Sequence, residues 1–157
     1  MTIHEPATVP PDAYMTFSRL VRTQTRLWNA VDARVRVDHG VPLTQLTALQ
    51  VVASTESCRV RDLVDTLHIT VGGASKVVDR LASAGFVTRV VNDRDRRSPV
   101  LMSTSSGRAL LEAAAPTLDA VLRDELVGRL PAEDLITLNR ILGQLAGPAE
   151  PSTGGTP

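Results

Sequence analysis

The sequence has only one cysteine in 157 residues, no long apolar run and no net charge, since 17 Lys and Arg balance 17 Asp and Glu. The lone thiol, Cys58, cannot form an internal disulfide, which favours a reducing compartment. No stretch of about 18 apolar residues is present, so we expect no membrane span. Residues 1–12 lack the basic start and apolar core of a signal peptide. These features predict a soluble, cytoplasmic protein that does not contact a membrane.

The composition is that of one globular domain. Apolar residues make up 43% and charged residues 22%, which excludes a wholly disordered, collagenous or disulfide-stapled chain. The charges are unevenly distributed, because residues 59–108 hold nine Lys and Arg against five Asp and Glu. This basic middle in a neutral protein is the first indication of an acidic partner.

Both ends of the chain are predicted to carry long amphipathic helices. Residues 12–38 show an apolar stripe at helical spacing, ended by Gly40, and a shorter helix follows from Pro42. Residues 105–146 are helical again, with Pro116 expected to kink a helix and Pro131 to begin the last one. These helices expose more apolar surface than a small monomer covers, so we expect a homodimer built from 12–38 and 105–146.

The middle of the chain predicts a helix-turn-helix followed by a hairpin. A helix of about two turns covers 60–67, His68 lies in the turn with a plausible positive φ, and Thr70 caps a second helix that closes at Gly85. Two β-rich runs, 86–91 and 99–104, then flank a charged tip at 92–98. The fold class is therefore mainly α with a small β-hairpin wing, a winged helix-turn-helix (43–104) between N- and C-terminal dimerisation helices. Residues 1–11 are predicted to form a flexible arm, and residues 147–157 are predicted to form a disordered tail.

This arrangement suits double-stranded DNA, whose major groove admits one helix and whose phosphates attract Arg and Lys. Small residues at the start of the second helix let its backbone approach closely, and donors one turn later can reach bases or phosphates. The charged tip suits minor-groove insertion or phosphate contact. The candidate DNA-binding residues are Gly72, Gly73, Ser75, Lys76, Arg80, Arg94, Asp95, Arg96 and Arg97.

The stretch RVRDLVDTLHITVGGASKVVDRLASAGFVTRVVNDRDRRSPVLMSTSSGRALL resembles the MarR family of winged helix-turn-helix regulators. The motifs that carry the resemblance are Asp79-Arg80-Leu81 before Gly85, the wing Asp95-Arg96-Arg97, and Ser103-Thr104 before Gly107. With the helical flanks, the likeness covers roughly residues 12–146.

The resemblance implies a homodimeric repressor that binds an inverted-repeat operator and is released by a small-molecule effector. Reading helices would lie in successive major grooves and wings in the flanking minor grooves. Ser75, Lys76 and Arg80 then map to the reading helix, and Asp95 and Arg97 to the wing tip. Gly72-Gly73 departs from the polar residues usual in the family, which favours a larger share of phosphate contacts and DNA shape.

Several residues have two interpretations. Cys58 beside Arg59 is either a redox sensor or an inert thiol at a helix junction. Trp28 either packs in the core or interface, or forms a wall of a ligand pocket with Tyr14, Arg26 or His39 nearby. An alternative function is a small-molecule or protein-interaction module that does not bind DNA. No spacing suggests a metal site, a cofactor or a catalytic set, so we expect no enzyme.

Overall fold

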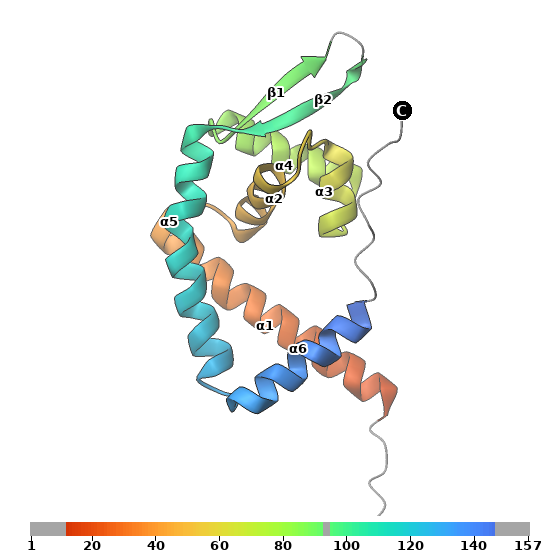
Figure 1. The fold of residues 1–157 in the computed structure, drawn as a ribbon, viewed down its shortest axis with the longest axis vertical. Helices are drawn as coiled ribbons and strands as arrows, with labels where there is room; N and C mark the ends of the chain where they lie inside the picture. Colours follow the sequence, from red (N-terminus) through yellow and green to blue (C-terminus); the bar gives the residue numbers. More distant parts are fainter. Residues whose placement is uncertain (1–11, 93–94, 147–157) are drawn as a thin grey trace, which may run out of the picture.

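The structure, a computed structural model, describes residues 12–92 and 95–146 (Figure 1). Its elements are α1 (Ala13–His39), α2 (Leu43–Ser54), α3 (Val60–Leu67), α4 (Val71–Ser83), β1 (Val87–Asn92), β2 (Asp95–Ser103), α5 (Ser105–Leu122), a π-helical turn η1 (Arg123–Val127) and α6 (Ala132–Ala146). This mainly helical chain with a two-stranded antiparallel hairpin confirms the predicted fold class. The arm expected at 1–11 and the tail expected at 147–157 lie outside the described residues.

Helices α2, α3 and α4 gather beneath the hairpin, and α5 runs from the base of the hairpin down the side of the molecule to η1 and α6 (Figure 1). We call residues 43–104 the winged segment, and α1, α5, η1 and α6 the outer helices. None of the helices in 12–92 and 95–146 combines the length and apolar character needed to cross a bilayer.

The ends of the helices follow local sequence rules. Gly40 ends α1 in the left-handed region at φ 71°, as its position predicted. His68 ends α3 with a positive φ of 52°, also as predicted. Thr70 caps α4, because its Oγ1 accepts a hydrogen bond of 3.1 Å from the amide of Gly73.

The start of α2 is capped from another helix. Its own N-cap residue, Pro42, makes no side-chain hydrogen bond, and Asp32 of α1 accepts instead from the amide of Leu43 at 2.7 Å. Asp32 also accepts from Arg36 at 2.6 Å. The Arg36 guanidinium, followed by the Leu43 amide, holds the pKa of Asp32 below its usual range. The winged segment is thereby attached to α1 at its first residue.

The hairpin reaches further than the sequence indicated. A seven-residue tip at 92–98 was expected, but this prediction is wrong, because Asn92 pairs with Asp95 and the strands extend to these residues. The pairing is irregular below the tip. Between the Val90–Val100 pair and the Asn92–Asp95 pair, β1 advances two residues and β2 advances five. Strand β2 therefore has a bulge of three extra residues.

The Ser103-Thr104 motif before Gly107 joins the hairpin to α5. Thr104 Oγ1 donates to the carbonyl of Gly85 at 2.7 Å and accepts from the amide of Gly107 at 3.0 Å, which caps α5. Gly107 is buried so closely that an added Cβ would lie 2.3 Å from the carbonyl oxygen of Phe86. This contact explains why glycine stands at that position.

Helix α5 passes through Pro116 without ending, as expected, and then widens into the π-turn η1, which the sequence did not indicate. An ion pair between Arg26 of α1 and Glu125 fastens this turn, and Arg129 lies 3.3 Å from the same carboxylate. These arginines, Arg26 foremost, hold the pKa of Glu125 below its usual range. Helix α6 begins directly after Pro131, as predicted.

Two hydrophobic clusters hold the fold together. One fills the winged segment, where Leu49, Leu63, Leu81 and other side chains are fully buried. The second lies where the end of α1 and the start of α2 meet α5. Phe86, Leu110 and Leu111 pack against both clusters, so α5 is shared between them.

Candidate nucleic-acid interface

Helix α4 divides into a buried face and an open face. Ala74, Val78 and Leu81 are fully buried against the rest of the winged segment. On the other side, Gly72, Lys76 and Arg80 follow one another at intervals of four residues, which places them in a row along the helix. Lys76 and Arg80 are exposed, and Gly72 lies at the open leading end. Ser75, also a candidate, is half-buried beside this row.

The two adjacent glycines have different surroundings. A Cβ on Gly72 would meet no atom within 4 Å, so no packing contact of the described chain requires glycine there. A Cβ on Gly73 would lie 3.2 Å from Thr70 Oγ1, the atom that caps the helix. Gly73 therefore serves the cap, whereas Gly72 leaves open space in front of the first turn.

The cations of this row are available to an external anion. Lys76 and Arg80 have no hydrogen bond or ion pair with another residue in the described part of the chain. The nearby carboxylate of Asp79 is occupied, since Arg89 of β1 donates to it at 2.5 Å. This pair neutralises the acidic residue of the face and ties α4 to the hairpin. Ten residues separate its members, so no local pattern revealed it.

The hairpin is also attached to the segment that precedes α3. The carbonyl of Cys58 accepts from the amide of Leu101 at 2.7 Å. Arg59 Nη1 donates to the carbonyl of Ser98 at 2.6 Å, three residues along the same strand. Neither contact was foreseen, because both join residues about forty positions apart.

The wing candidates are only partly described. Arg94 lies outside the described residues. The backbone of Asp95, Arg96 and Arg97 forms the first part of β2, while their side chains lie outside the description. Arg96 and Arg97 belong to the bulged part of the strand, between the pairs of Asp95 and Val100.

Cys58 is placed in the hydrophobic core. Its side chain is fully buried in the cluster of the winged segment. Burial, with the neighbouring Asp62 carboxylate, raises the pKa of the thiol to about 11. A redox sensor needs an accessible thiolate, so this environment favours the inert thiol over the redox alternative.

The four candidates for a ligand pocket lie along α1 without converging. Tyr14 is 74% exposed near the start of the helix, and His39 bonds Thr117 Oγ1 of α5 at 2.9 Å near its end. These two are about 37 Å apart along the helix at about 1.5 Å per residue. Trp28 is exposed between them, and Arg26 is engaged with Glu125.

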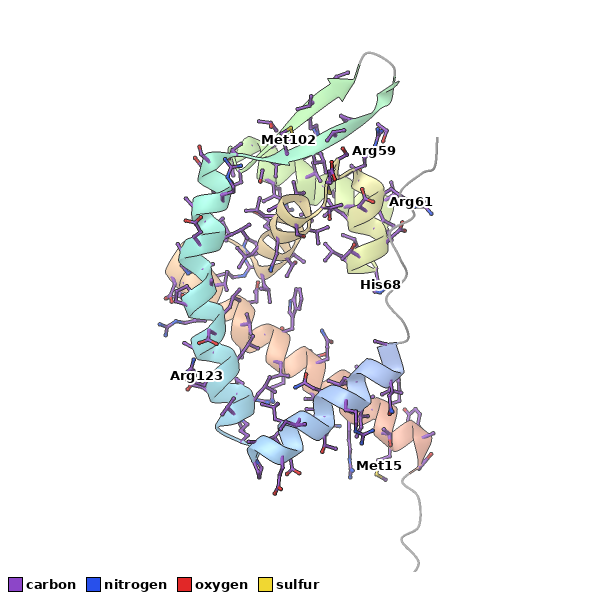
Figure 2. The ribbon with its side chains drawn as sticks, viewed as in Figure 1. Met15, Arg59, Arg61, His68, Met102 and Arg123 are labelled. Carbon is purple, nitrogen blue, oxygen red and sulfur yellow. The ribbon has the colours of Figure 1, made fainter. Side chains whose placement is uncertain are left out.

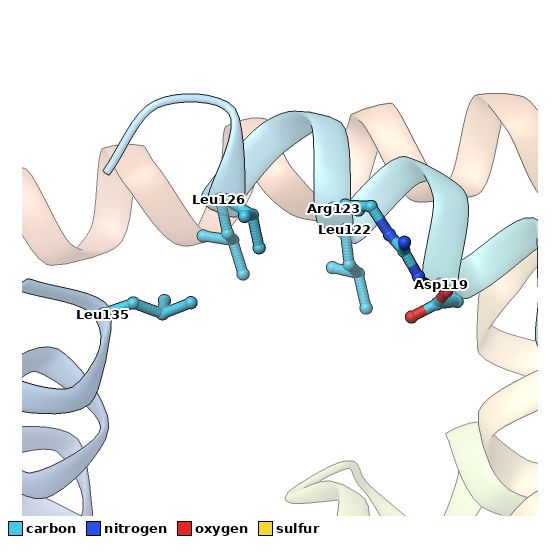
Figure 3. Close-up of a pocket in the computed structure, with 6 residues that line it drawn as sticks. Asp119, Leu122, Arg123, Leu126 and Leu135 are labelled. Atoms are coloured by element: carbon cyan, nitrogen blue, oxygen red, sulfur yellow. Dashed lines mark hydrogen bonds and ion pairs between the residues drawn. The ribbon is translucent and has the colours of Figure 1, made fainter. Parts of the chain in front are cut away.

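The lower end of the molecule contains an open hollow of about 360 Å³ (Figure 3). Leu122, Leu126 and Leu135 point into it from α5, η1 and α6, and the Asp119–Arg123 ion pair lies at one side. The lining is mostly apolar, although it faces solvent in the single chain.

The outer helices also expose a broad apolar surface. Helix α6 has no buried residue, and the only buried residues of α1 are Val31 and Val35 in its C-terminal half. The exposed large apolar residues of these helices are Tyr14, Met15, Phe17, Leu20, Val21, Trp28, Val37, Leu122, Val127, Ile136, Ile141, Leu142 and Leu145. In Figure 2, the label Met15 marks α1 and the label Arg123 marks η1.

Comparison with known proteins points to one family. A MarR family model matches residues 39–98, which cover most of the winged segment. The multiple antibiotic resistance protein MarR of Escherichia coli is 30% identical over 81 residues, corresponding to 52% of this chain and 56% of that protein. The chain thus spans little more than half the length of this curated relative in the alignment.

Solved structures extend the likeness to the outer helices. Sco3205, a MarR family transcriptional regulator from Streptomyces coelicolor solved in complex with DNA, has a TM-score of 0.77 at 24% identity, over 96% of this chain and 95% of that chain. BpsR of Bordetella bronchiseptica, whose DNA binding is regulated by 6-hydroxynicotinic acid, also has a TM-score of 0.77, at 20% identity over 84% and 98% of the two chains. The family model coincides with most of the winged segment and the shared fold includes the outer helices, so the chain is similar to MarR family proteins in both regions.

Proposed function

We propose that this protein is a sequence-specific DNA-binding transcriptional regulator whose helix α4 enters the major groove. The observation that carries the proposal is the open row of Gly72, Lys76 and Arg80 on a helix whose opposite face is fixed in a hydrophobic core. A B-DNA major groove is about 12 Å wide and admits one helix. Sco3205 shares this fold and has been solved with DNA, which supports the proposal.

The residues of the interface have separate roles in this proposal. Gly72 and Gly73 allow the helix N-terminus to approach a phosphate or base edge, and Ser75 and Lys76 supply donors to bases or phosphates. Arg80 contacts the backbone one turn later. On the wing, Arg94, Asp95, Arg96 and Arg97 contact the flanking minor grooves, where Asp95 can hold an arginine extended.

The regulator acts as a homodimer in this proposal, and the outer helices form the interface. Their exposed apolar side chains and the hollow beside Leu122 would be covered by a second copy. A two-fold dimer presents two α4 helices to an inverted-repeat operator. Repression of nearby genes follows if the operator overlaps a promoter. The likeness to BpsR supports release of DNA by a small-molecule effector.

Gel-shift assays with DNA from upstream of its own gene test the proposal. We expect Lys76→Ala and Arg80→Ala each to weaken binding and to reduce the slope of log affinity against log salt by about one. Arg34→Ala is the matched control, because Arg34 is an exposed arginine paired with Asp38 on α1, far along the chain from α4. Its slope is expected to stay near that of the wild type.

Two results would reject this assignment. If Lys76→Ala and Arg80→Ala bind like the wild type, α4 is not the reading element. If the wild type binds no duplex even at low salt, the chain is an interaction module on the same fold. In vitro transcription from the bound DNA distinguishes a repressor from an activator. Added protein lowers the transcript yield for a repressor and raises it for an activator.

A further inference from the structure

Strand β2 departs from regular pairing in its bulged part. The three extra residues of the bulge lie between Asp95 and Val100, a stretch that includes Arg96 and Arg97. Pro99 in the same stretch has no amide hydrogen, so it donates no hydrogen bond to β1. An isolated two-stranded hairpin is only marginally stable in water. The direction of this part of the wing therefore depends on contacts with the rest of the winged segment.

Arg59 supplies such a contact at the bulge. Its Nη1 donates to the carbonyl of Ser98 at 2.6 Å, directly before Pro99. The same residue is fixed at its backbone, because its amide donates to Asp62 Oδ2 at 2.7 Å at the start of α3. Figure 2 shows Arg59 between the hairpin and α3. Arg59, a half-buried residue, thus links the N-terminus of α3 through its backbone to the irregular part of the wing through its side chain.

Helix chemistry alone does not account for arginine at this position. Arg59 is the N-cap residue of α3, where Ser, Thr, Asp and Asn are preferred because their side chains accept from the helix amides. A guanidinium has no acceptor and cannot cap. The cap-like contact here runs from the backbone amide of Arg59 to Asp62, and a backbone amide is present in any residue except proline. The side chain of Arg59 instead serves the contact with Ser98.

We propose that Arg59 is a positioning residue for DNA binding, which holds the bulged part of β2 and so directs Arg96 and Arg97 toward the DNA flanking the α4 contact. This inference rests on the proposed function. Arg59 acts through the wing and not by contacting DNA. The preceding residue, Cys58, accepts a hydrogen bond at its carbonyl from the amide of Leu101. Residues 58 and 59 together therefore fix β2 at two points.

The test compares the wild type with Arg59→Ala on a duplex that the wild type selects from a random-sequence pool. Hydroxyl-radical footprinting reports the minor-groove flanks, and protection of guanine N7 from dimethyl sulfate reports the major groove. We expect Arg59→Ala to lose protection of the flanks and keep protection of the major groove. Its affinity should fall about tenfold, and the slope of log affinity against log salt should fall by more than one, because more than one phosphate contact is lost. A residue that itself contacted one phosphate would reduce the slope by about one and leave the flanks protected.

Two further variants separate the bridge from charge and from folding. Arg61→Ala removes an equally charged residue two positions along, which pairs with Asp65 in an exposed ion pair, and we expect it to retain flank protection. Arg59→Lys keeps the charge and one donor toward the Ser98 carbonyl, so it should restore part of the flank protection. Thermal unfolding of each variant checks that α3 and α4 remain folded.

The outcomes distinguish this inference from the proposed function. A wild type that binds no duplex rejects the proposed function itself. A wild type that binds with protected flanks, together with an Arg59→Ala variant that protects the same flanks, overturns the role of Arg59 while leaving DNA binding intact. Equal loss of the flanks in Arg61→Ala would also overturn it, because charge alone would then explain the effect.

Discussion

The winged segment and the outer helices contrast in where their apolar side chains lie. In the winged segment, Leu49, Leu63 and Leu81 are fully buried within one chain. In the outer helices, α6 buries nothing, and residues such as Ile136 and Leu145 are 71% and 66% exposed. Both regions are amphipathic in sequence, yet α6 and the N-terminal half of α1 bury no residue within the single chain.

This difference indicates two sources of stability. The winged segment is stabilised by contacts that do not depend on protein concentration. Helix α6 and the N-terminal half of α1 depend on whatever covers their apolar faces, which in the proposed function is a second copy. Their stability should then rise with protein concentration, because association favours the folded form by mass action.

The largest expected effect comes from the core of the winged segment. Leu81→Ala should lower the free energy of unfolding by about 3 kcal/mol, because it removes buried methyl groups and leaves a cavity. Urea unfolding at several protein concentrations measures it, and the loss should be the same at each. Leu145→Ala is the matched control in α6. It should change little in dilute protein and shift the dissociation of the proposed dimer in sedimentation runs. An equal loss in dilute protein would remove the contrast.

The second effect compares two helical glycines. Gly107→Ala places a Cβ against the Phe86 carbonyl and the Leu49 side chain, so we expect a loss of about 2 kcal/mol from overpacking. Gly143→Ala in α6 meets no atom within 4 Å and should be neutral or stabilising by up to about 1 kcal/mol. Chemical denaturation of the two variants gives both values. A neutral Gly107→Ala would show that α5 is free to move away from the hairpin.

The third effect concerns the link between the two regions. Asp32→Ala removes the cap of α2 and should cost about 1 kcal/mol, as expected for a lost N-cap. Asp65→Ala removes only an exposed i,i+4 ion pair with Arg61 and should cost less than about 0.5 kcal/mol. The comparison by thermal unfolding fails if the two variants are indistinguishable.

The smallest expected effects are on the pH dependence of stability. The outer helices should respond at acidic pH and the winged segment at alkaline pH. The lowered pKa values of Asp32, Asp38 and Glu125 belong to α1 and η1. In each case the largest cause of the lowered pKa is a side-chain hydrogen bond from an arginine, which is Arg36 for Asp32, Arg34 for Asp38 and Arg26 for Glu125. A carboxylate with a lowered pKa stabilises the fold above its unfolded pKa, so stability should fall below about pH 4.

At alkaline pH the winged segment should weaken instead. The raised pKa of Cys58 stabilises the fold below its unfolded pKa of about 8.5, and this contribution is lost as pH rises toward about 11. Cys58→Ala removes the titrating group and should flatten the pH profile of unfolding between these limits. Identical alkaline profiles for the variant and the wild type would contradict the effect of the buried thiol.

The predictable parts of this structure were those set by neighbours in sequence. Gly40, His68 and Thr70 mark helix ends through their own φ preferences or side-chain oxygens, so their roles were visible locally. The uninterrupted apolar pattern across Pro116 likewise indicated that α5 continues beyond it. The open row on α4 followed from helical spacing once its buried positions were identified.

The parts that escaped prediction depend on residues distant in sequence. The cap of α2 comes from Asp32 on another helix, and the wing is held by Arg59 and by the Asp79–Arg89 pair. Pro99 was the one local sign of the bulge in β2, and the turn η1 had none that the sequence analysis used. In the candidate interface, the sequence therefore indicated the α4 face but not the contacts that orient the wing.

Helix α5 has one more consequence for a dimer of this kind. Its first turn is joined to the hairpin through Thr104, while the turn after its last residue is fastened to α1 through Glu125. Its 18 residues span about 27 Å, so an inclination changed by about 10° displaces its upper end by about 5 Å. Successive major grooves are about 34 Å apart, and two such displacements in opposite directions would take the helices of the pair out of step with the duplex.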